Sequence, residues 1–290
     1  MSGVFVLIAA KVSAAFSCGK ILKCTVATDK SVVTTTLETE ITKFEIPFFL
    51  ISQETRLNHE GKTQLLNIGG NNQLEQLIFT ELNYPQTALE SEIEGFVQFN
   101  FNLKQNGELK NLTITGNNLI SFQEVAEDLF YKIDWIKTVK RPQDYAVEFA
   151  LIFNPKKFSK IAKKRGYQEV PKPTVEVSTS YKPINFNEVS TKPEPIFKEG
   201  NYKSADHYFN SKIRYPESAI RLGLKGPVVM EYIIEASGNV TNINFIESLG
   251  GGCNEEAIRV LTSLKWKPGI EDGKVVRVKA KTQMVFGPSY

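Results

Sequence analysis

Side chains that commonly carry acid–base or nucleophilic catalysis are few in this chain and are not arranged as a catalytic set. The two histidines, His59 and His207, occupy unrelated sequence contexts. Cys253 follows three glycines at the expected start of a helix, where the helix dipole could favour a thiolate, but no base accompanies it. The same glycines are not followed by the Lys-Ser/Thr pair of a phosphate-binding loop. We therefore expect a protein that is not an enzyme and uses no cofactor.

The cysteines and the overall charge argue against two further classes of function. Cys18, Cys24 and Cys253 form neither a disulfide framework nor paired CxxC motifs with zinc-like spacing, so no metal site is expected. A net charge of +3 over 290 residues is too small to indicate nucleic acid as the main partner. Locally, the segment between Pro155 and Pro195 carries nine basic residues against four acidic ones, a balance that could attract an anionic surface.

The last strand-like run, residues 275–286, has a pattern that suits recognition better than catalysis. Its apolar and β-branched residues alternate with basic and amide residues, as in a half-buried strand. A loop marked by Pro268, Gly269 and Gly273 precedes it. The elements that must position this strand are predicted from an internal repeat in the sequence.

An internal repeat with an offset of 131 residues organises the chain. It needs no gap across 67 residues and gives eleven identities, mainly at glycine, proline and aromatic positions, where backbone geometry or packing restricts the choice. We therefore expect two diverged copies of one module. The matched pairs are Gly69/Gly200, Tyr84/Tyr215, Pro85/Pro216, Ala88/Ala219, Gly95/Gly226, Val97/Val228, Gly107/Gly238, Asn111/Asn242, Glu124/Glu255, Ala126/Ala257 and Trp135/Trp266.

Each copy is predicted to have the order strand, strand, helix, strand. Apolar periodicity and turn residues place the second copy's elements at 228–235, 239–247, 254–266 and 275–286. The first copy's elements fall at 96–104, 108–115, 122–133 and 146–153. We expect an α+β fold with two domains, residues 69–153 and 197–290, each a three-stranded antiparallel sheet with helices on one face.

Three other segments complete the predicted organisation. Residues 1–24 include an apolar stretch shorter than the roughly 20 residues of a spanning helix, which indicates a signal or anchor segment, with lipid attachment at Cys18 or a buried strand as alternatives. Residues 25–68 are strand-like and unassigned. Residues 154–196 form a Pro/Lys-rich linker, expected to be a semi-rigid spacer with a reach on the order of 100 Å.

The second copy also carries a set of marker residues whose joint spacing is specific, although each alone is weak. In this set the copy resembles the C-terminal domain of TonB-type energy transducers. The first copy, from Gly69 to Phe153, resembles the same domain, but it lacks the glycine-rich and Pro-Gly signals. The markers are Tyr215, Pro216, Gly226, Gly238, Ala257, Trp266, Pro268, Gly269 and Phe286.

The resemblance implies that the domain grips N-terminal peptides of outer-membrane transporters by adding them as a strand at a sheet edge, with an inner-membrane motor complex as a second partner. Strand addition takes affinity from main-chain hydrogen bonds and specificity from alternate side chains. The basic residues of the last strand have an alternative explanation, a solvated edge kept charged against aggregation. By similarity the partner-binding residues are Arg214, Val276, Arg277, Val278, Lys279, Ala280, Lys281 and Gln283.

The sequence therefore predicts a TonB-like protein of the periplasm and cell envelope that supports energy-coupled transport across the membrane. The alternative is a periplasmic adaptor or scaffold with the same fold and no coupling to a motor, because a convincing spanning helix and the usual position of the Pro-rich spacer are both missing. An exposed edge strand also allows homodimerisation by sheet addition.

Overall fold

The chain divides into two compact units, residues 1–45 and 46–290. In the first unit, β1 (Cys24–Thr28) and β2 (Ser31–Thr35) form an antiparallel hairpin. The predicted signal or anchor segment lies outside the described residues except for Cys24, and no described helix is long and apolar enough to cross a membrane. The computed structural model describes residues 24–28, 31–35, 49–51, 57–59, 62–64, 70–104, 106–135 and 145–287.

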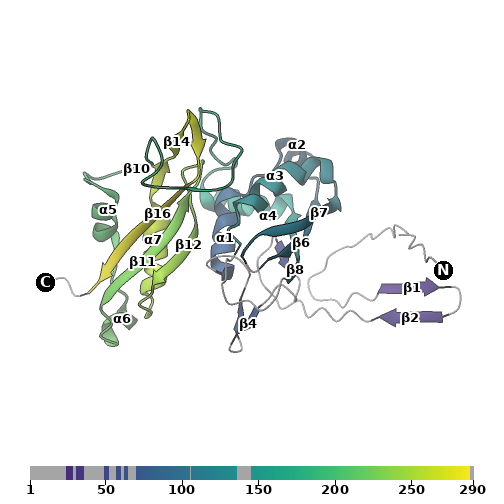
Figure 1. The fold of residues 1–290 in the computed structure, drawn as a ribbon, viewed down its shortest axis with the longest axis horizontal. Coiled ribbons are helices and arrows are strands. Elements are labelled where there is room, and N and C mark those ends of the chain that lie inside the picture. The colour runs from purple at the N-terminus through teal and green to yellow at the C-terminus, as the bar shows by residue number, and fades with distance from the viewer. Residues whose placement is uncertain are drawn as a thin grey trace. The chain divides into compact units, whose positions relative to one another are not determined.

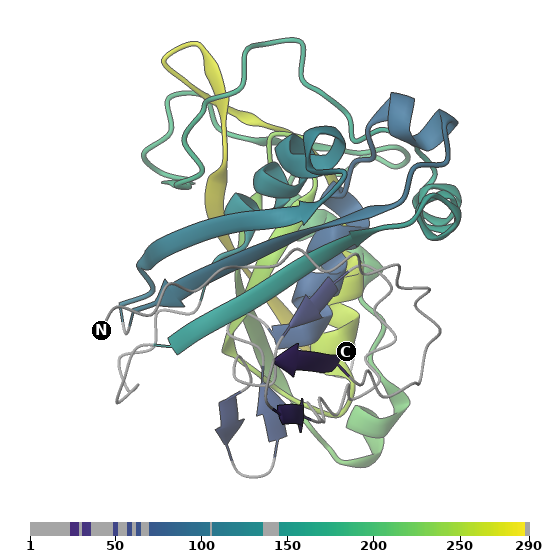
Figure 2. The same ribbon diagram turned by 90° about the vertical axis from the view of Figure 1, so that its right-hand side faces the viewer.

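The second unit begins with short strands and then forms the first copy's sheet, in the order β3-β8-β6-β7. All its pairings are antiparallel, and the long strands run side by side in Figure 2. A separate hairpin joins β4 (Leu57–His59) to β5 (Lys62–Gln64). The sheet strands are β3 (Phe49–Ile51), β6 (Gly95–Leu103), β7 (Leu109–Asn117) and β8 (Tyr145–Phe153). The helices are α1 (Gly70–Glu81), α2 (Gln86–Glu90) and α3 (Leu119–Lys132).

Alternation along β6 explains why this sheet keeps one face against the helices. Val97, Phe99, Phe101 and Leu103 are buried, while the residues between them are half-buried. Phe99 stacks on Phe130 of α3, with ring centroids 4.3 Å apart. Burial of each such apolar side chain contributes roughly 1.5–3 kcal/mol, so this face stabilises the first copy.

The second copy's sheet has the order β12-β11-β16-β9, with β9 joined in parallel to β16. Figure 1 shows β12, β11 and β16 side by side, with α7 across one face. The sheet strands are β9 (Ile184–Asn185), β11 (Gly226–Ile234), β12 (Val240–Glu247) and β16 (Val278–Phe286). The helices are α5 (Ala205–Lys212), α6 (Glu217–Arg221) and α7 (Cys253–Ser263). Four short strands flank the sheet: β10 (Glu194–Ile196), β13 (Lys265–Lys267), β14 (Gly269–Glu271) and β15 (Lys274–Val276).

The elements of the two copies fall at matching positions. An offset of 131 carries the bounds of α2 onto α6 and of β6 onto β11. Tyr84 donates to the carbonyl of Ile93, and its counterpart Tyr215 donates to Leu224 nine residues on as well. Gly238 has φ 77°, and an added Cβ would overlap the carbonyl oxygen of Trp266, so this hairpin turn requires glycine. The strand, strand, helix, strand order predicted for each copy is therefore present.

Two parts of the prediction do not hold. Each sheet has four strands, because β3 extends the first and β9 the second. Residues 154–196 are not extended throughout: α4 (Pro155–Arg165) packs Phe158 and Ala162 into the first core, and β9 and β10 pair with strands of the second copy. Parts of the segment are thus packed against both copies, through α4 on the first and through β9 and β10 on the second, and the linker prediction did not consider these contacts.

Candidate functional site

The predicted peptide-binding edge is the side of β16 that faces away from β11. On the β11 side, β16 is paired along its whole length. On the other side, β9 pairs only with Val278 and Lys279. The N–H of Ile184 donates to the carbonyl of Arg277 and that of Phe186 to the carbonyl of Lys279, both at 2.9 Å.

Beyond Lys279, no strand of the described chain pairs with this side of β16. Because successive residues of a strand point their N–H and C=O groups to opposite sides, Lys281, Gln283 and Val285 direct theirs to the same side as Lys279. All three side chains are exposed. The edge therefore offers a row of backbone donors and acceptors to an extended peptide.

A segment of the chain itself already lies along the first part of this edge. We name residues 176–186 the strap. Upstream of β9, Val275 donates to the carbonyl of Glu176 and accepts from the N–H of Ser178, both at 2.8 Å. Side chains of Ile184 and Phe186 pack, partly buried, against a small cluster of Val189, Val276 and Val278. The strap thus takes both the main-chain and side-chain positions that a peptide would use there.

The predicted site residues divide into three groups in the structure. Val276, Val278 and Ala280 are buried, the first two under the strap and its neighbours and the third in the core of the second copy. Lys279 is half-buried, with its Nζ 3.6 Å from a carboxylate oxygen of Glu231. Lys281 and Gln283 are exposed beside the unpaired stretch of the edge.

Arg277 was predicted to contact a partner at the edge, with a solvated, charged edge as the alternative explanation. The structure instead buries its side chain in the absence of a partner. It is 7% exposed and pairs with Glu235, whose carboxylate accepts two guanidinium bonds at 2.8 Å. Burial lowers the pKa of this guanidinium, but Glu235, with smaller contributions from Asp134 and Glu81, raises it by more, so the net pKa is raised. The alternation that predicted a solvated side chain fails here because β15 ends at Val276 and β16 starts at Val278, leaving Arg277 between them.

Arg214 is exposed and lies apart from the paired strands, between α5 and α6. Its backbone N–H donates to Glu256 Oε1 of α7 at 2.7 Å. Arg259, one turn along the same helix, also donates to Glu256, at 2.6 Å and 2.7 Å. The hydrogen bonds from Arg259 are the main reason that the pKa of Glu256 is lowered from its ordinary 4.5.

This lowered pKa gives a pH prediction. A carboxyl whose pKa is depressed by folding adds stability above its unfolded pKa and loses it as the pH falls through the folded value. Glu256→Gln should therefore lower the melting temperature near pH 7, and the difference from the unmodified chain should shrink below about pH 4.5. Glu255→Gln, an exposed neighbour on the same turn, is the control. A Glu256→Gln difference that stays constant to pH 3 would refute this role.

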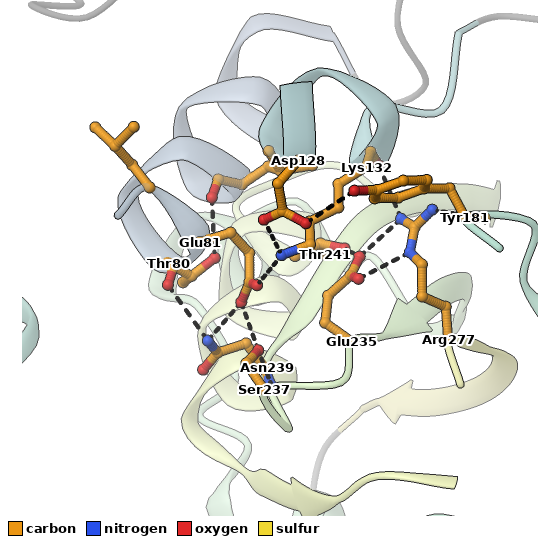
Figure 3. Close-up of polar contacts among 12 residues, drawn as sticks. Thr80, Glu81, Asp128, Lys132, Tyr181, Glu235, Ser237, Asn239, Thr241 and Arg277 are labelled. Atoms are coloured by element: carbon orange, nitrogen blue, oxygen red, sulfur yellow. Dashed lines mark hydrogen bonds and ion pairs between the residues drawn. The ribbon is translucent and has the colours of Figure 1, made fainter. Parts of the chain in front are cut away.

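A buried polar network joins the two copies and includes Arg277 (Figure 3). The carbonyl of Lys132, at the end of α3, accepts from Arg277 at 2.8 Å and from Asn242 of β12 at 2.9 Å. Arg277 also donates to the carbonyl of Tyr181 in the strap, at 2.6 Å. The guanidinium of Arg277, which is paired with Glu235 inside the second copy, therefore also contacts the first copy and the strap.

The other half of the network is centred on Glu81 of α1, whose side chain is fully buried. Lys132 Nζ lies 3.1 Å from Glu81 and 2.9 Å from Asp128. Burial lowers the pKa of Lys132, but the charges of these two carboxylates and of Glu235 together raise it above its ordinary value. Glu81 also accepts from Ser237 and Asn239 of the second copy, both at 2.6 Å. Buried charges are tolerated when they are paired and hydrogen-bonded, as they are here.

Sequence reasoning missed Glu81 and Glu235, and the repeat explains why. The offset of 131 aligns Glu81 with Lys212 and Glu235 with Lys104, so these carboxylates are specific to one copy. A comparison that rewards identity overlooks them. The available signal for these two carboxylates was that the aligned positions of the two copies carry opposite charges. Residues at a contact between the copies are expected to differ in this way, because each copy presents a different surface to the other.

Cys253 remains a poor candidate for catalysis in the folded chain. It is buried, and burial followed by the nearby Glu255 raises the pKa of its thiol, the opposite of what a nucleophile needs. No cluster of three or more metal-binding side chains occurs in the described part of the chain.

The geometry so far describes an antiparallel sheet with a helix across one face and an added strand at its last edge. Residues 211–288 match the family model of the Gram-negative bacterial TonB protein C-terminal. The match spans the segment from the end of α5 through β16 and so includes the candidate edge. This TonB C-terminal family is not a family of enzymes, and its fold agrees with the α+β architecture of the second copy.

A solved structure is also similar to part of the chain. The NMR solution structure of the Helicobacter pylori TonB C-terminal domain (residues 194–285) is 23% identical, covers 28% of this chain and 87% of its own, and superposes with a TM-score of 0.22. A search of curated proteins gives no match.

Proposed function

We propose that the second copy is a TonB-like envelope domain that binds peptide segments of outer-membrane transporters as an added strand on β16, in support of energy-coupled transport. One observation carries the proposal: the edge of β16 holds an added parallel strand, β9, over its first two positions. The unpaired groups of Lys281, Gln283 and Val285 continue that edge. The family match over residues 211–288 supports the class of partner.

The alternative of an adaptor or scaffold without motor coupling has an observation in its favour. Within residues 154–196, α4 packs on the first copy and β9 and β10 pair with the second, which limits the reach that a transducer would need. We propose residues 69–153 as a diverged copy of the same domain, whose role in either case is to hold the second copy and the strap through the network around Lys132 and Arg277.

The test is a titration of the full chain with N-terminal peptides of outer-membrane transporters from the same cell, followed by amide NMR. We expect saturable shifts on residues 278–286 and in the strap. The same peptide N-methylated at alternate residues should bind several-fold more weakly, because each lost main-chain hydrogen bond costs about 1 kcal/mol. Failure of every such peptide to bind the folded chain would refute the transporter assignment and leave the fold without this partner.

A further inference from the structure

One face of α4 carries five lysines that the proposed function does not use. At about 100° per residue these positions span an arc of about 120° on the helix surface, and all five side chains are exposed. Phe158 and Ala162 lie on the opposite side and are buried in the first core. Asn154 caps the helix and Gly166 ends it, so the face is held rigidly. We name the five residues the lysine stripe: Lys156, Lys157, Lys160, Lys163 and Lys164.

Only the C-terminal part of the stripe favours its own helix, because Lys163 and Lys164 lie in the last turn, where the helix dipole stabilises cations. None of its lysines forms an ion pair with a described residue, and only Lys164 has an aromatic contact, 5.8 Å above the ring of Phe79. Like charges four residues apart, as in Lys156 and Lys160, destabilise a helix. Lys156 and Lys157 also lie in the first turn, where no acidic residue is present and the helix dipole disfavours cations.

The chemistry of the stripe favours one kind of occupant. Protein interfaces are depleted in lysine and rely on aromatic or arginine anchors, and single-stranded nucleic acid is held by aromatic stacking. The exposed side of α4 offers neither, since Arg165 turns inward and donates to the carbonyl of Leu82 at 2.7 Å. Clusters of four to eight basic residues are instead attracted to anionic lipid headgroups.

We infer that the lysine stripe docks the chain on a bilayer surface rich in anionic phospholipid. The attachment is electrostatic and peripheral, because the apolar side of α4 is packed in the protein and cannot enter the bilayer. Lys163 of the stripe also borders a shallow hollow that Phe158, Ala162 and Tyr167 line from the side of the first core.

The experiment is co-sedimentation of the full chain with vesicles of phosphatidylcholine alone or mixed with phosphatidylglycerol. We expect binding only to the anionic vesicles, and its loss when added salt screens the surface. The variant Lys156→Gln/Lys160→Gln/Lys164→Gln should reduce partitioning on the order of 100-fold, because each basic residue near such a surface contributes separately. All three positions are exposed, and circular dichroism checks that the variant remains folded.

The matched control is Lys198→Gln/Lys203→Gln/Lys225→Gln, three exposed lysines of the second copy. Both triple variants reduce the formal net charge from +3 to zero, so they differ only in where charge is removed. Equal loss in both would show that bulk charge, not the stripe, is responsible and would overturn the inference. It is also overturned if the chain ignores anionic vesicles, or if it binds an acidic polypeptide through the stripe in preference to them.

Discussion

Replacing Glu235 with alanine should lower the free energy of unfolding by about 3–5 kcal/mol, the range for removing one partner of a buried ion pair. The side chain of Glu235 is fully buried and that of Arg277 is 8% exposed. Without the carboxylate, the guanidinium stays in the interior with no opposite charge in direct contact. Thr241, which donates to Glu235, also loses its acceptor. Urea denaturation of the full chain, followed by the fluorescence of Trp135 and Trp266, measures the loss.

A surface pair provides the control for this prediction. Lys267 and Glu194 are 2.9 Å apart, but their side chains are 67% and 66% exposed. Glu194→Ala should therefore change the free energy of unfolding by no more than about 1 kcal/mol. A Glu235→Ala effect as small as this would mean that Arg277 is solvated after all. The double change Glu235→Leu/Arg277→Met should recover much of the stability, because paired removal leaves no buried charge.

The central role of Arg277 illustrates where sequence reasoning succeeds and where it stops. Alternation in β16 predicted the burial of Val278, Ala280 and Met284 correctly, because a strand with one covered face must alternate. The same rule predicted an outward Arg277. It failed because Arg277 lies between β15 and β16, where contacts with α3 and the strap, and not the sheet, set the direction of the side chain.

The missed helix α4 had a local signature that could have been found. Asn154 accepts from the N–H of Lys157 at 3.0 Å, Pro155 occupies the first turn, and Gly166 ends the helix with φ 84°. Asn-Pro before a helix and glycine after it are recognised start and stop signals. The proline and lysine content of residues 154–196 outweighed them in the linker prediction.

The strap had no comparable signature. Its strand β9 is two residues long, too short for any periodic pattern, and it pairs with residues almost one hundred positions later. Only the complementary edge of β16 defines it. Short strands of this kind depend on tertiary contacts, so a single sequence does not reveal them.

Removing the strap from the edge should strengthen peptide binding on the order of 30-fold, if the proposed function holds. The variant is Ile184→Pro/Phe186→Pro, which eliminates the two N–H groups that donate to β16. Each such bond contributes about 1 kcal/mol, and about 2 kcal/mol corresponds to a factor near 30 in affinity. When a competing state occupies the site, apparent affinity rises as that state is depopulated.

The control is Asn185→Pro, because parallel pairing with β16 uses the backbone groups of residues 184 and 186 and directs those of Asn185 away. Peptide affinity should be nearly unchanged in this variant, whereas in the double variant the amides of Arg277 and Lys279 should also exchange faster when no peptide is present. Equal peptide affinity in all three proteins would place the peptide entirely on Lys281 to Val285, beyond the strap. If the amides exchange faster in the double variant but none of the three proteins binds a peptide, the strap remains a structural element and the peptide partner is rejected. The role of the strap and the peptide partner can therefore be refuted separately. If the double variant does bind peptide more tightly, the strap differs from an ordinary edge strand in one respect: its removal raises the affinity for a ligand while it lowers the stability of the fold.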